Sequence, residues 1–207
     1  MNQNQTSTDK VLITGGEGFI GTNLKKLYPD AYIIDKSLGK DICEYLPDEP
    51  FTHIFHLAAK HHISTCEKEV EECVKINCWG TLNILKTYPD ARIILAASSS
   101  GNEIRSVYGA TKKFVEIVSQ LNKNCLAVRF YNVFGEHQKL EGGAFTPKAI
   151  NHCLTGKPLT INGDGTQARD FSFDVECVSR QESDALALAE LVRTRCSFYR
   201  GAFGDAT

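Results

Sequence analysis

The chain of 207 residues carries 23 Lys plus Arg against 25 Asp plus Glu, which gives a formal net charge of −2. There is no excess of positive charge to neutralise a phosphate backbone or an anionic membrane surface, so the sequence predicts neither nucleic-acid binding nor membrane binding. Hydrophobic residues make up 42% and charged residues 23%, a composition typical of a globular protein with a buried core. The length accommodates one good-sized domain, or a domain with a small lobe.

Residues 1–9 are polar and lack the apolar segment of a secretory signal, so we expect a disordered tail on a cytoplasmic protein. The 8 cysteines show no Cys-x-x-Cys pair and no zinc-finger spacing. A chain of this length and apolar content does not need disulfides to hold its fold. We therefore expect free thiols rather than a disulfide or metal framework.

Short apolar runs alternate with helix-like segments over residues 10–135, a pattern typical of a parallel sheet covered by helices. Strands are predicted at Lys10–Thr14, Ala31–Asp35, His53–Leu57, Arg92–Ala97 and Cys125–Phe130. Apolar residues three and four apart predict helices over Phe19–Leu27, Val70–Leu85 and Tyr108–Leu121. The fold class is therefore α/β, a doubly wound parallel sheet of Rossmann-like type.

The texture of the sequence changes after Gly135, where glycines and turn-forming residues become frequent. We expect one further strand at Leu159–Asn162 and a helix that Ser183 caps and that runs to about Arg195. Residues 136–207 are thus predicted to form a small lobe appended to the sheet.

The first predicted strand runs into a glycine-rich turn and then a helix. Gly16-x-Gly18-x-x-Gly21 matches the dinucleotide-binding fingerprint, and Gly15 is part of a second, nested pattern of the same kind. Glycines allow the backbone amides at a helix N-terminus to approach a pyrophosphate closely. Asp35 ends the second strand, where its carboxylate can accept hydrogen bonds from an adenosine ribose. This favours NAD over NADP, although the neighbouring Lys36 leaves NADP open.

Tyr108 and Lys112 are four residues apart on a predicted helix, so their side chains share one face. A tyrosine acts as a base near neutral pH only if its pKa falls by about three units from about 10. A nearby ammonium and an oxidised nicotinamide would stabilise the phenolate in this way. Ser98, Ser99 and Ser100 follow an apolar strand, at the edge where open α/β sheets bind their ligands.

Seven segments, in order, resemble the extended short-chain dehydrogenase/reductases, in particular the NAD-dependent nucleotide-sugar epimerases and dehydratases. The resemblance runs over residues 11–171, and its segments are Thr14–Gly21, His56–Ala59, Asn77–Asn83, Ser98–Ser100, Tyr108–Lys112, Arg129–Gly135 and Gly163–Phe171. It implies that NAD is the cofactor, a nucleotide sugar is the substrate, and a homodimer is the common assembly. Residues 10–135 would then form the NAD-binding domain and 136–207 a partial substrate-binding lobe.

The resemblance also implies roles for single residues. Tyr108 would be the base, Lys112 its electrostatic partner and ribose ligand, and Ser99 the hydroxyl that holds the reacting sugar oxygen, with Ser100 as the alternative. The implied cofactor-binding residues lie in the glycine turn, at the strand ends and on two helices: Gly15, Gly18, Phe19, Ile20, Gly21, Asp35, Asp41, Ile42, Ala58, Ala59, Asn77, Tyr108 and Lys112.

Asn132 and Arg169 resemble contacts to the substrate diphosphate, although Arg169 also has Asp164 and Asp170 as ion-pair candidates. His61 and His62 are interpreted as loop residues near the cleft that stay off the catalytic list. The sequence departs from the family in two places. Only nine residues lead from Ser99 to Tyr108, where the family has a longer loop, and the sequence after Phe171 no longer follows the family pattern.

The residues after Ser99 are Ser100 and Gly101 rather than the acid/base pair that elimination of water requires. An NAD-dependent nucleotide-sugar epimerase is therefore favoured. The alternatives are a nucleotide-sugar 4,6-dehydratase or reductase, and a non-catalytic NAD-binding module with a shortened substrate lobe.

Overall fold

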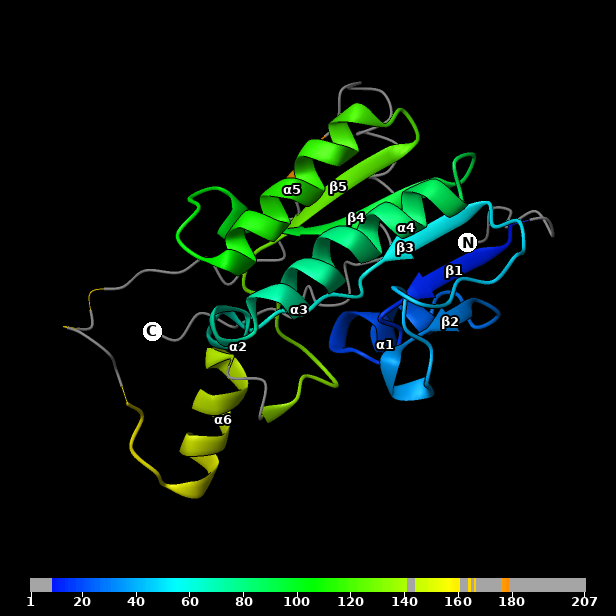
Figure 1. Cartoon of the computed structure of the whole chain (residues 1–207). Helices are drawn as coiled ribbons and strands as arrows, with labels where there is room; N and C mark the ends of the chain where they lie inside the picture. Colours follow the sequence, from blue (N-terminus) through cyan, green and yellow to red (C-terminus); the bar gives the residue numbers. More distant parts are fainter. Residues whose placement is uncertain (1–8, 141–143, 161–163, 165, 167–175, 179–207) are drawn as a thin grey trace.

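The computed structural model describes residues 9–140, 144–160, 164, 166 and 176–178. A six-stranded sheet forms the centre of the molecule, in the order β2-β1-β3-β4-β5-β6 (Figure 1). Its parallel strands are β1 (Val11–Thr14), β2 (Tyr32–Ile34), β3 (His53–His56), β4 (Arg92–Ser98) and β5 (Cys125–Phe130). β6 (Glu176–Val178) pairs with β5 in the antiparallel direction. The predicted α/β parallel sheet is confirmed, and the five strands predicted within residues 10–135 are all found within one residue of their expected bounds.

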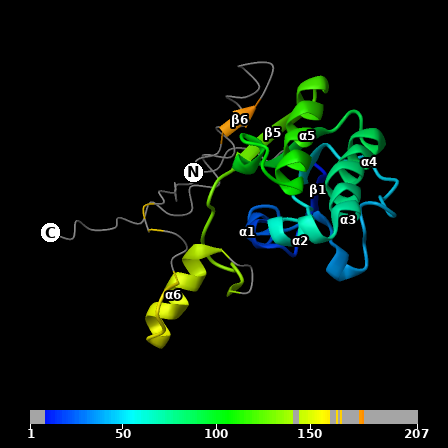
Figure 2. The same ribbon diagram turned by 60° about the vertical axis from the view of Figure 1, so that its left-hand side comes forward.

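The sheet carries an apolar core on both faces, because successive side chains of a strand point to opposite sides. On one face Leu12 and Ile54 pack with Ile84 of α4 (Gly80–Thr87) and Val115 of α5 (Val107–Leu121). On the other face Ile13, Phe55 and Ile94 form a second cluster, to which Leu24 of α1 (Phe19–Lys25) contributes. Figure 2 shows α1 on one side of β1 and α4 on the other. Burial on both faces explains why these strands read as continuous apolar runs.

The predicted helices correspond to α1, to α5, and to one helical stretch that is built from three parts. The three parts are α3 (Val70–Val74), a π-helical turn (Lys75–Trp79) and α4. α5 begins after Ser106, whose Oγ accepts a hydrogen bond of 3.0 Å from the N–H of Gly109. The π turn was not predicted, because a single extra residue leaves only a small irregularity in the apolar spacing.

Two α-helices and one strand of the described residues were not predicted: α2 (Ile63–Lys68), α6 (Phe145–Thr155) and β6. α2 has only six residues, which is too short to show helical periodicity. In the expected strand Leu159–Asn162, residues 159–160 are not in a strand, and the rest lies outside the described residues. The expected tail over residues 1–8 and the helix Ser183–Arg195 also lie outside them.

Two short helices joined at Glu69 bring Cys66 and Cys73 together in a disulfide, with a Cα–Cα distance of 5.3 Å. The expectation of free thiols is wrong for this pair, since the proximity comes from a helix–helix junction that the spacing of the cysteines does not reveal. Cys43, Cys78, Cys125 and Cys153 are free thiols, as expected. None of the helices within the described ranges is long and apolar enough to cross a membrane.

The strand order places a topological switch point between β1 and β3. From β1 the chain passes to β2 at one edge and then returns across β1 to β3, after which it proceeds towards β5. In open α/β sheets the crevice at the carboxyl ends of the strands, at such a switch point, is where ligands bind.

Candidate active site

A cleft of about 870 Å³ opens at the carboxyl ends of the parallel strands. It is lined by the segments that follow β1, β2, β3 and β5, by the end of β4, and by Tyr108 and Lys112 of α5. Most of the predicted cofactor-binding residues line it: Gly15, Gly18, Phe19, Ile20, Gly21, Asp35, Asp41, Ile42, Ala58, Ala59, Tyr108 and Lys112. The switch point and the predicted site therefore coincide.

The glycine turn after β1 is packed too closely to accept side chains. A Cβ atom on Gly15, which has φ +71°, would lie 2.7 Å from the backbone nitrogen of Ala58. A Cβ atom on Gly21 would lie 2.3 Å from the carbonyl oxygen of Gly15. The turn leads into α1, whose first amides have no intrahelical acceptor. A close backbone cradle with free N–H donors fits a pyrophosphate group.

The carboxylate of Asp35 is held in a defined orientation at the end of β2. Its Oδ1 accepts hydrogen bonds from the N–H of Ser37 (3.0 Å) and from the Ser37 hydroxyl (2.8 Å). Its Oδ2 accepts from the N–H of Glu17 in the glycine turn, at 3.0 Å. An acceptor fixed beside the turn fits the ribose of a dinucleotide.

Asp41 lies at the same end of the cleft as Asp35. Its Oδ1 accepts a hydrogen bond of 2.9 Å from the N–H of Cys43, which lowers the pKa of the carboxyl group although partial burial opposes the shift. Because its pKa is lowered, Asp41 is charged at neutral pH. The next residue, Ile42, is 4% exposed and belongs to the core as well as to the cleft wall.

Lys112 is buried on α5, with its ammonium donating a hydrogen bond of 2.6 Å to the carbonyl oxygen of Ala96 on β4. Burial lowers the pKa of Lys112 to about 8. The Nζ atom is 5.9 Å from the centre of the Tyr108 ring. Lys112 is thus charged near neutral pH and lies against the tyrosine, as the four-residue spacing predicts.

Burial raises the pKa of Tyr108, and a hydrogen bond with the side chain of Ser98 counteracts this only in part. The protein by itself thus keeps Tyr108 as a neutral phenol.

The serine that contacts Tyr108 is Ser98, which lines the cleft. Ser99 and Ser100 lie in the short 3-10 helix Ser99–Gly101 and are not among the cleft-lining residues; the N–H of Ser100 donates to Ser98 Oγ at 3.2 Å. The resemblance implied Ser99 as the hydroxyl that holds the sugar oxygen, with Ser100 as the alternative. In the structure β4 extends one residue beyond its predicted end, and of the three serines Ser98 lines the cleft.

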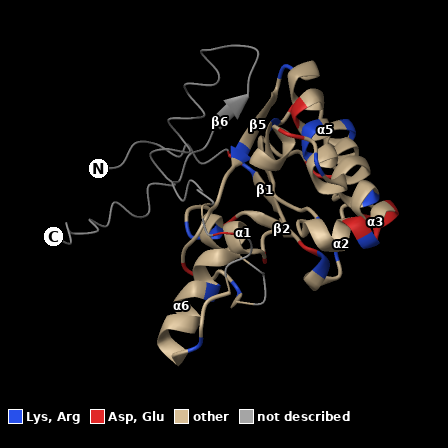
Figure 3. Ribbon diagram, turned by 90° about the vertical axis from the view of Figure 1, so that its left-hand side faces the viewer, with Lys and Arg blue, Asp and Glu red and all other residues tan. Residues whose placement is uncertain are grey.

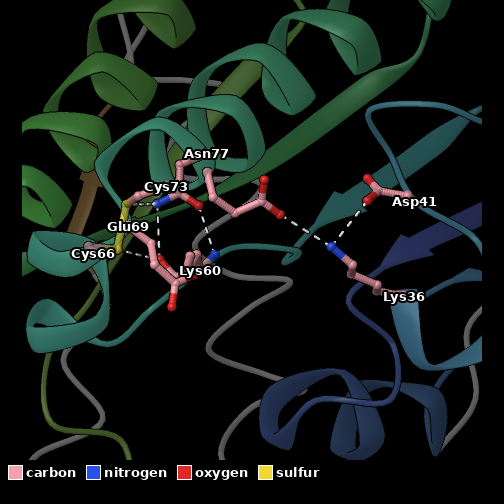
Figure 4. Close-up of polar contacts among 8 residues, drawn as sticks. Lys36, Asp41, Lys60, Cys66, Glu69, Cys73 and Asn77 are labelled. Atoms are coloured by element: carbon pink, nitrogen blue, oxygen red, sulfur yellow. Dashed lines mark hydrogen bonds and ion pairs between the residues drawn. A yellow bond between two sulfur atoms is a disulfide. The ribbon is translucent and has the colours of Figure 1, made fainter.

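Asn77 is 1% exposed and lies behind the cleft wall rather than in it. Its Oδ1 accepts from the N–H of Lys60 (2.8 Å), and its Nδ2 donates to the carbonyl oxygen of Lys60 (3.0 Å) and to the Thr111 hydroxyl (3.0 Å). Figure 4 shows this pairing beside the disulfide. Asn77 therefore fixes the cleft-lining segment after β3, instead of contacting the cleft directly as the resemblance implied.

Several cleft-lining residues were not in the predicted set. His61 and His62 line the cleft with their rings 4.2 Å apart, and burial together with the neighbouring His62 lowers the pKa of His61. Lys60, Tyr131, Gln138 and Lys139 also line it. Of the two residues predicted to contact the diphosphate, Asn132 is exposed and is not a lining residue, and Arg169 lies outside the described residues. Loop residues of this kind carry no periodic signal in the sequence.

His56 on β3 is a buried residue of the fold rather than of the site. Its Nδ1 is 2.7 Å from the Thr14 hydroxyl, and its Nε2 is 3.0 Å from the Thr81 hydroxyl. Burial, with a smaller contribution from the charge of Lys112, lowers the pKa of His56 to about 3. Within the described parts of the chain, no group of three or more His, Cys, Asp or Glu side chains could hold a metal ion.

The fold and the cleft define a dinucleotide-binding α/β protein with a tyrosine and a lysine at the site. The profile of the NAD-dependent epimerase/dehydratase family matches residues 11–179, so the chain belongs to that family and NAD is its cofactor.

Relatives include the uncharacterized UDP-glucose epimerase YtcB of Bacillus subtilis, 28% identical over 82% of this chain and 70% of YtcB. A UDP-N-acetyl-alpha-D-glucosaminuronate decarboxylase of Bacillus cytotoxicus is 27% identical over 82% of this chain and 68% of its own length. The UDP-N-acetylglucosamine 4-epimerase of Methanobrevibacter ruminantium, solved with UDP-N-acetylmuramic acid, superposes with a TM-score of 0.73 at 23% identity, over 81% of this chain and 69% of that one. This likeness supports the fold.

Proposed function

We propose that the protein is an NAD-dependent nucleotide-sugar epimerase, with residues 10–135 holding NAD and the following residues contributing to the sugar site. The observation that carries the proposal is that Tyr108, Lys112 and Ser98 line the same cleft as the glycine turn. Bound NAD supplies the chemistry of accepting a hydride from a sugar carbon and returning it.

Tyr108 removes the proton of the sugar hydroxyl as general base, and Ser98 holds the same hydroxyl through its own oxygen. Since burial raises the pKa of Tyr108, the phenolate forms only with positive charge in the cleft. Lys112 contributes one such charge at neutral pH, because its lowered pKa of about 8 still leaves it protonated. Its hydrogen bond to Ala96 keeps the ammonium against the tyrosine during the reaction.

The segment after Ser98 favours an epimerase over a dehydratase. Elimination of water needs an acid and a base close to the reacting hydroxyl, but the residues that follow are Ser99, Ser100 and Gly101. Glu103, the nearest carboxylate along the chain, is exposed and forms an ion pair with Arg105 at 2.5 Å.

The short connection from Ser98 to Tyr108 supports a second candidate function, a non-catalytic NAD-binding module.

The proposal is tested by incubating the protein with NAD and a panel of UDP-, GDP- and dTDP-sugars and identifying the products by chromatography and mass spectrometry. We expect an epimer of at least one sugar from the unmodified protein and none from Tyr108→Phe, while NAD affinity in calorimetry stays within about twofold, because only the base is removed. NAD binding without reaction on any sugar would favour the non-catalytic module. Unaltered turnover by Tyr108→Phe would exclude Tyr108 as the base.

A further inference from the structure

Charged side chains of a 3-10 helix, a loop and an α-helix meet at the end of the cleft where Asp35 lies. Lys36, in the 3-10 helix Lys36–Leu38 that follows β2, has its Nζ 3.2 Å from Oε1 of Glu72. The same Nζ is 3.5 Å from Oδ2 of Asp41, a contact labelled in Figure 4. Glu72 belongs to α3, which comes after β3 in the sequence. The side chains of Lys36, Asp41 and Glu72 all line the cleft. The ammonium of Lys36 thus joins the segment after β2 to the helix after β3.

The hydrogen bond to Glu72 is the main reason why the pKa of Lys36 is raised. Lys40, the other lysine at this end of the cleft, is also engaged. Its Nζ donates to the Tyr32 hydroxyl at 3.1 Å and lies 4.3 Å from the centre of that ring. Each of these two cations therefore has partners of its own within the protein.

The distinction between NAD and NADP is a 2′-phosphate on the adenosine ribose, which needs a cation where NAD meets a carboxylate. Lys36 directly follows Asp35 and is the residue that such a phosphate would recruit. We propose that Glu72 is a specificity-determining residue: by binding the ammonium of Lys36, it keeps this lysine from pairing with a 2′-phosphate and so enforces the preference for NAD. This inference rests on the dinucleotide site of the proposed function.

The backbone of α3, which carries Glu72, is held in place by neighbouring residues. Cys73, the residue after Glu72, forms the disulfide with Cys66 of α2, and both side chains are completely buried. Asn77, one turn further along, is fastened to the backbone of Lys60. Glu72 is therefore presented from a fixed backbone, although its own side chain is partly exposed.

The negative charges at this end of the cleft also disfavour NADP. With Glu72 in place, a 2′-phosphate would face the carboxylates of Asp35, Asp41 and Glu72, while Lys36 is already paired. With an uncharged residue at position 72, Lys36 keeps only its longer contact to Asp41 and becomes free to form a charge-assisted hydrogen bond to phosphate. Because the pair is partly exposed, we expect a gain in NADP affinity of about three- to tenfold.

The test is calorimetric titration of the full chain with NAD and with NADP at low ionic strength, where exposed charges are least screened. Glu72→Gln is the main variant, and Glu71→Gln is the matched control, since Glu71 is the neighbouring, exposed carboxylate on α3. Figure 3 shows acidic residues, in red, on this helix. We expect Glu72→Gln to raise the affinity for NADP relative to NAD by about three- to tenfold and Glu71→Gln to leave the ratio unchanged. In the background of Lys36→Met, Glu72→Gln should give no gain.

An unchanged ratio in Glu72→Gln would overturn the inference. So would a gain of equal size in the Lys36→Met background, because it would show that removal of a negative charge is sufficient without the lysine. If the unmodified protein bound neither dinucleotide, the proposed function would fail and this inference with it. Normal NAD binding with unaltered selectivity would overturn the inference alone.

Discussion

Glu116 of α5 and Arg129 of β5 form a two-point ion pair, in which Nη2 of the arginine donates to Oε2 of the glutamate at 2.9 Å and Nε donates to Oε1. The Glu116 side chain is only 1% exposed. Burial opposes its ionisation, but hydrogen bonds from Arg129 and Lys113 outweigh this and lower the pKa of Glu116. The pair therefore links α5, the helix that carries Tyr108 and Lys112, to strand β5 of the sheet.

Glu116→Gln should therefore destabilise the fold, because it removes the buried carboxylate that accepts two hydrogen bonds from the Arg129 guanidinium. We expect the free energy of unfolding, measured in urea, to fall by about 3 kcal/mol. The control is Lys113→Met, which removes the more exposed partner of Glu116 and should cost less than about 1 kcal/mol. Equal losses in the two variants would show that the buried pair has no special weight.

Ser98→Ala and Ser99→Ala distinguish the serine in the structure from the serine that the resemblance favoured. Ser98 lines the cleft together with Tyr108, so its replacement should lower kcat about 100-fold with little change in NAD affinity. Ser99→Ala should change kcat by less than about threefold, because Ser99 does not line the cleft. Steady-state kinetics on the sugar identified above measure both. A larger loss for Ser99→Ala would return the role to Ser99.

His56 should make the fold sensitive to mild acid. Its pKa of about 3 in the folded state lies below the ordinary value of 6.5, so the unfolded chain binds a proton that the folded chain does not. The stability contribution is present above pH 6.5 and is lost as the pH falls, by about 2 kcal/mol between pH 7 and pH 5. Urea unfolding at the two pH values should show this loss in the unmodified protein and a smaller one in His56→Gln. The same pH dependence in both proteins would exclude His56 as its source.

The disulfide closes a loop of 8 residues, and its removal should cost stability by enlarging the unfolded ensemble. For a loop of this size the expected loss is about 2 kcal/mol. The variant Cys66→Ala/Cys73→Ala and the reduced unmodified protein should both show it in thermal and urea unfolding. Cys153→Ala, at an exposed thiol, is the control and should leave stability unchanged. If reductant destabilised the double variant as much as the unmodified protein, the effect would not come from this disulfide.

The sheet and the dinucleotide end of the cleft could be predicted from sequence, because both depend on local patterns. Apolar runs specify buried strands, and Gly15, Gly21 and Asp35 occupy positions fixed by their distance from the strand ends. Residues whose role depends on tertiary neighbours could not be placed in this way. Asn77 hydrogen-bonds to the backbone of Lys60 instead of lining the cleft. Cys66 and Cys73 are close enough for a disulfide because two short helices join at one residue.

The Ser98–Ser100 triplet shows where prediction from sequence stops being precise. All three residues are chemically alike, and the choice among them depends on where a strand stops, which sequence patterns locate only to within a residue or two. In a strand a shift of one residue turns a side chain to the opposite face. The sequence therefore predicts a serine at this edge of the sheet, and the structure adds that Ser98 is the one of the three that lines the cleft.

The π turn at Lys75–Trp79 contains one residue more than an α-helix would need at that point. An extra residue offsets the two ends of a helix by about 100° about the axis. Loss of any single residue from this turn would thus rotate Glu72 and Cys73 out of alignment with their partners while α4 stayed packed on the sheet. The length of the turn, independently of its side chains, sets the rotation about the helix axis between α4, which packs in the core, and α3, whose Glu72 lines the cleft.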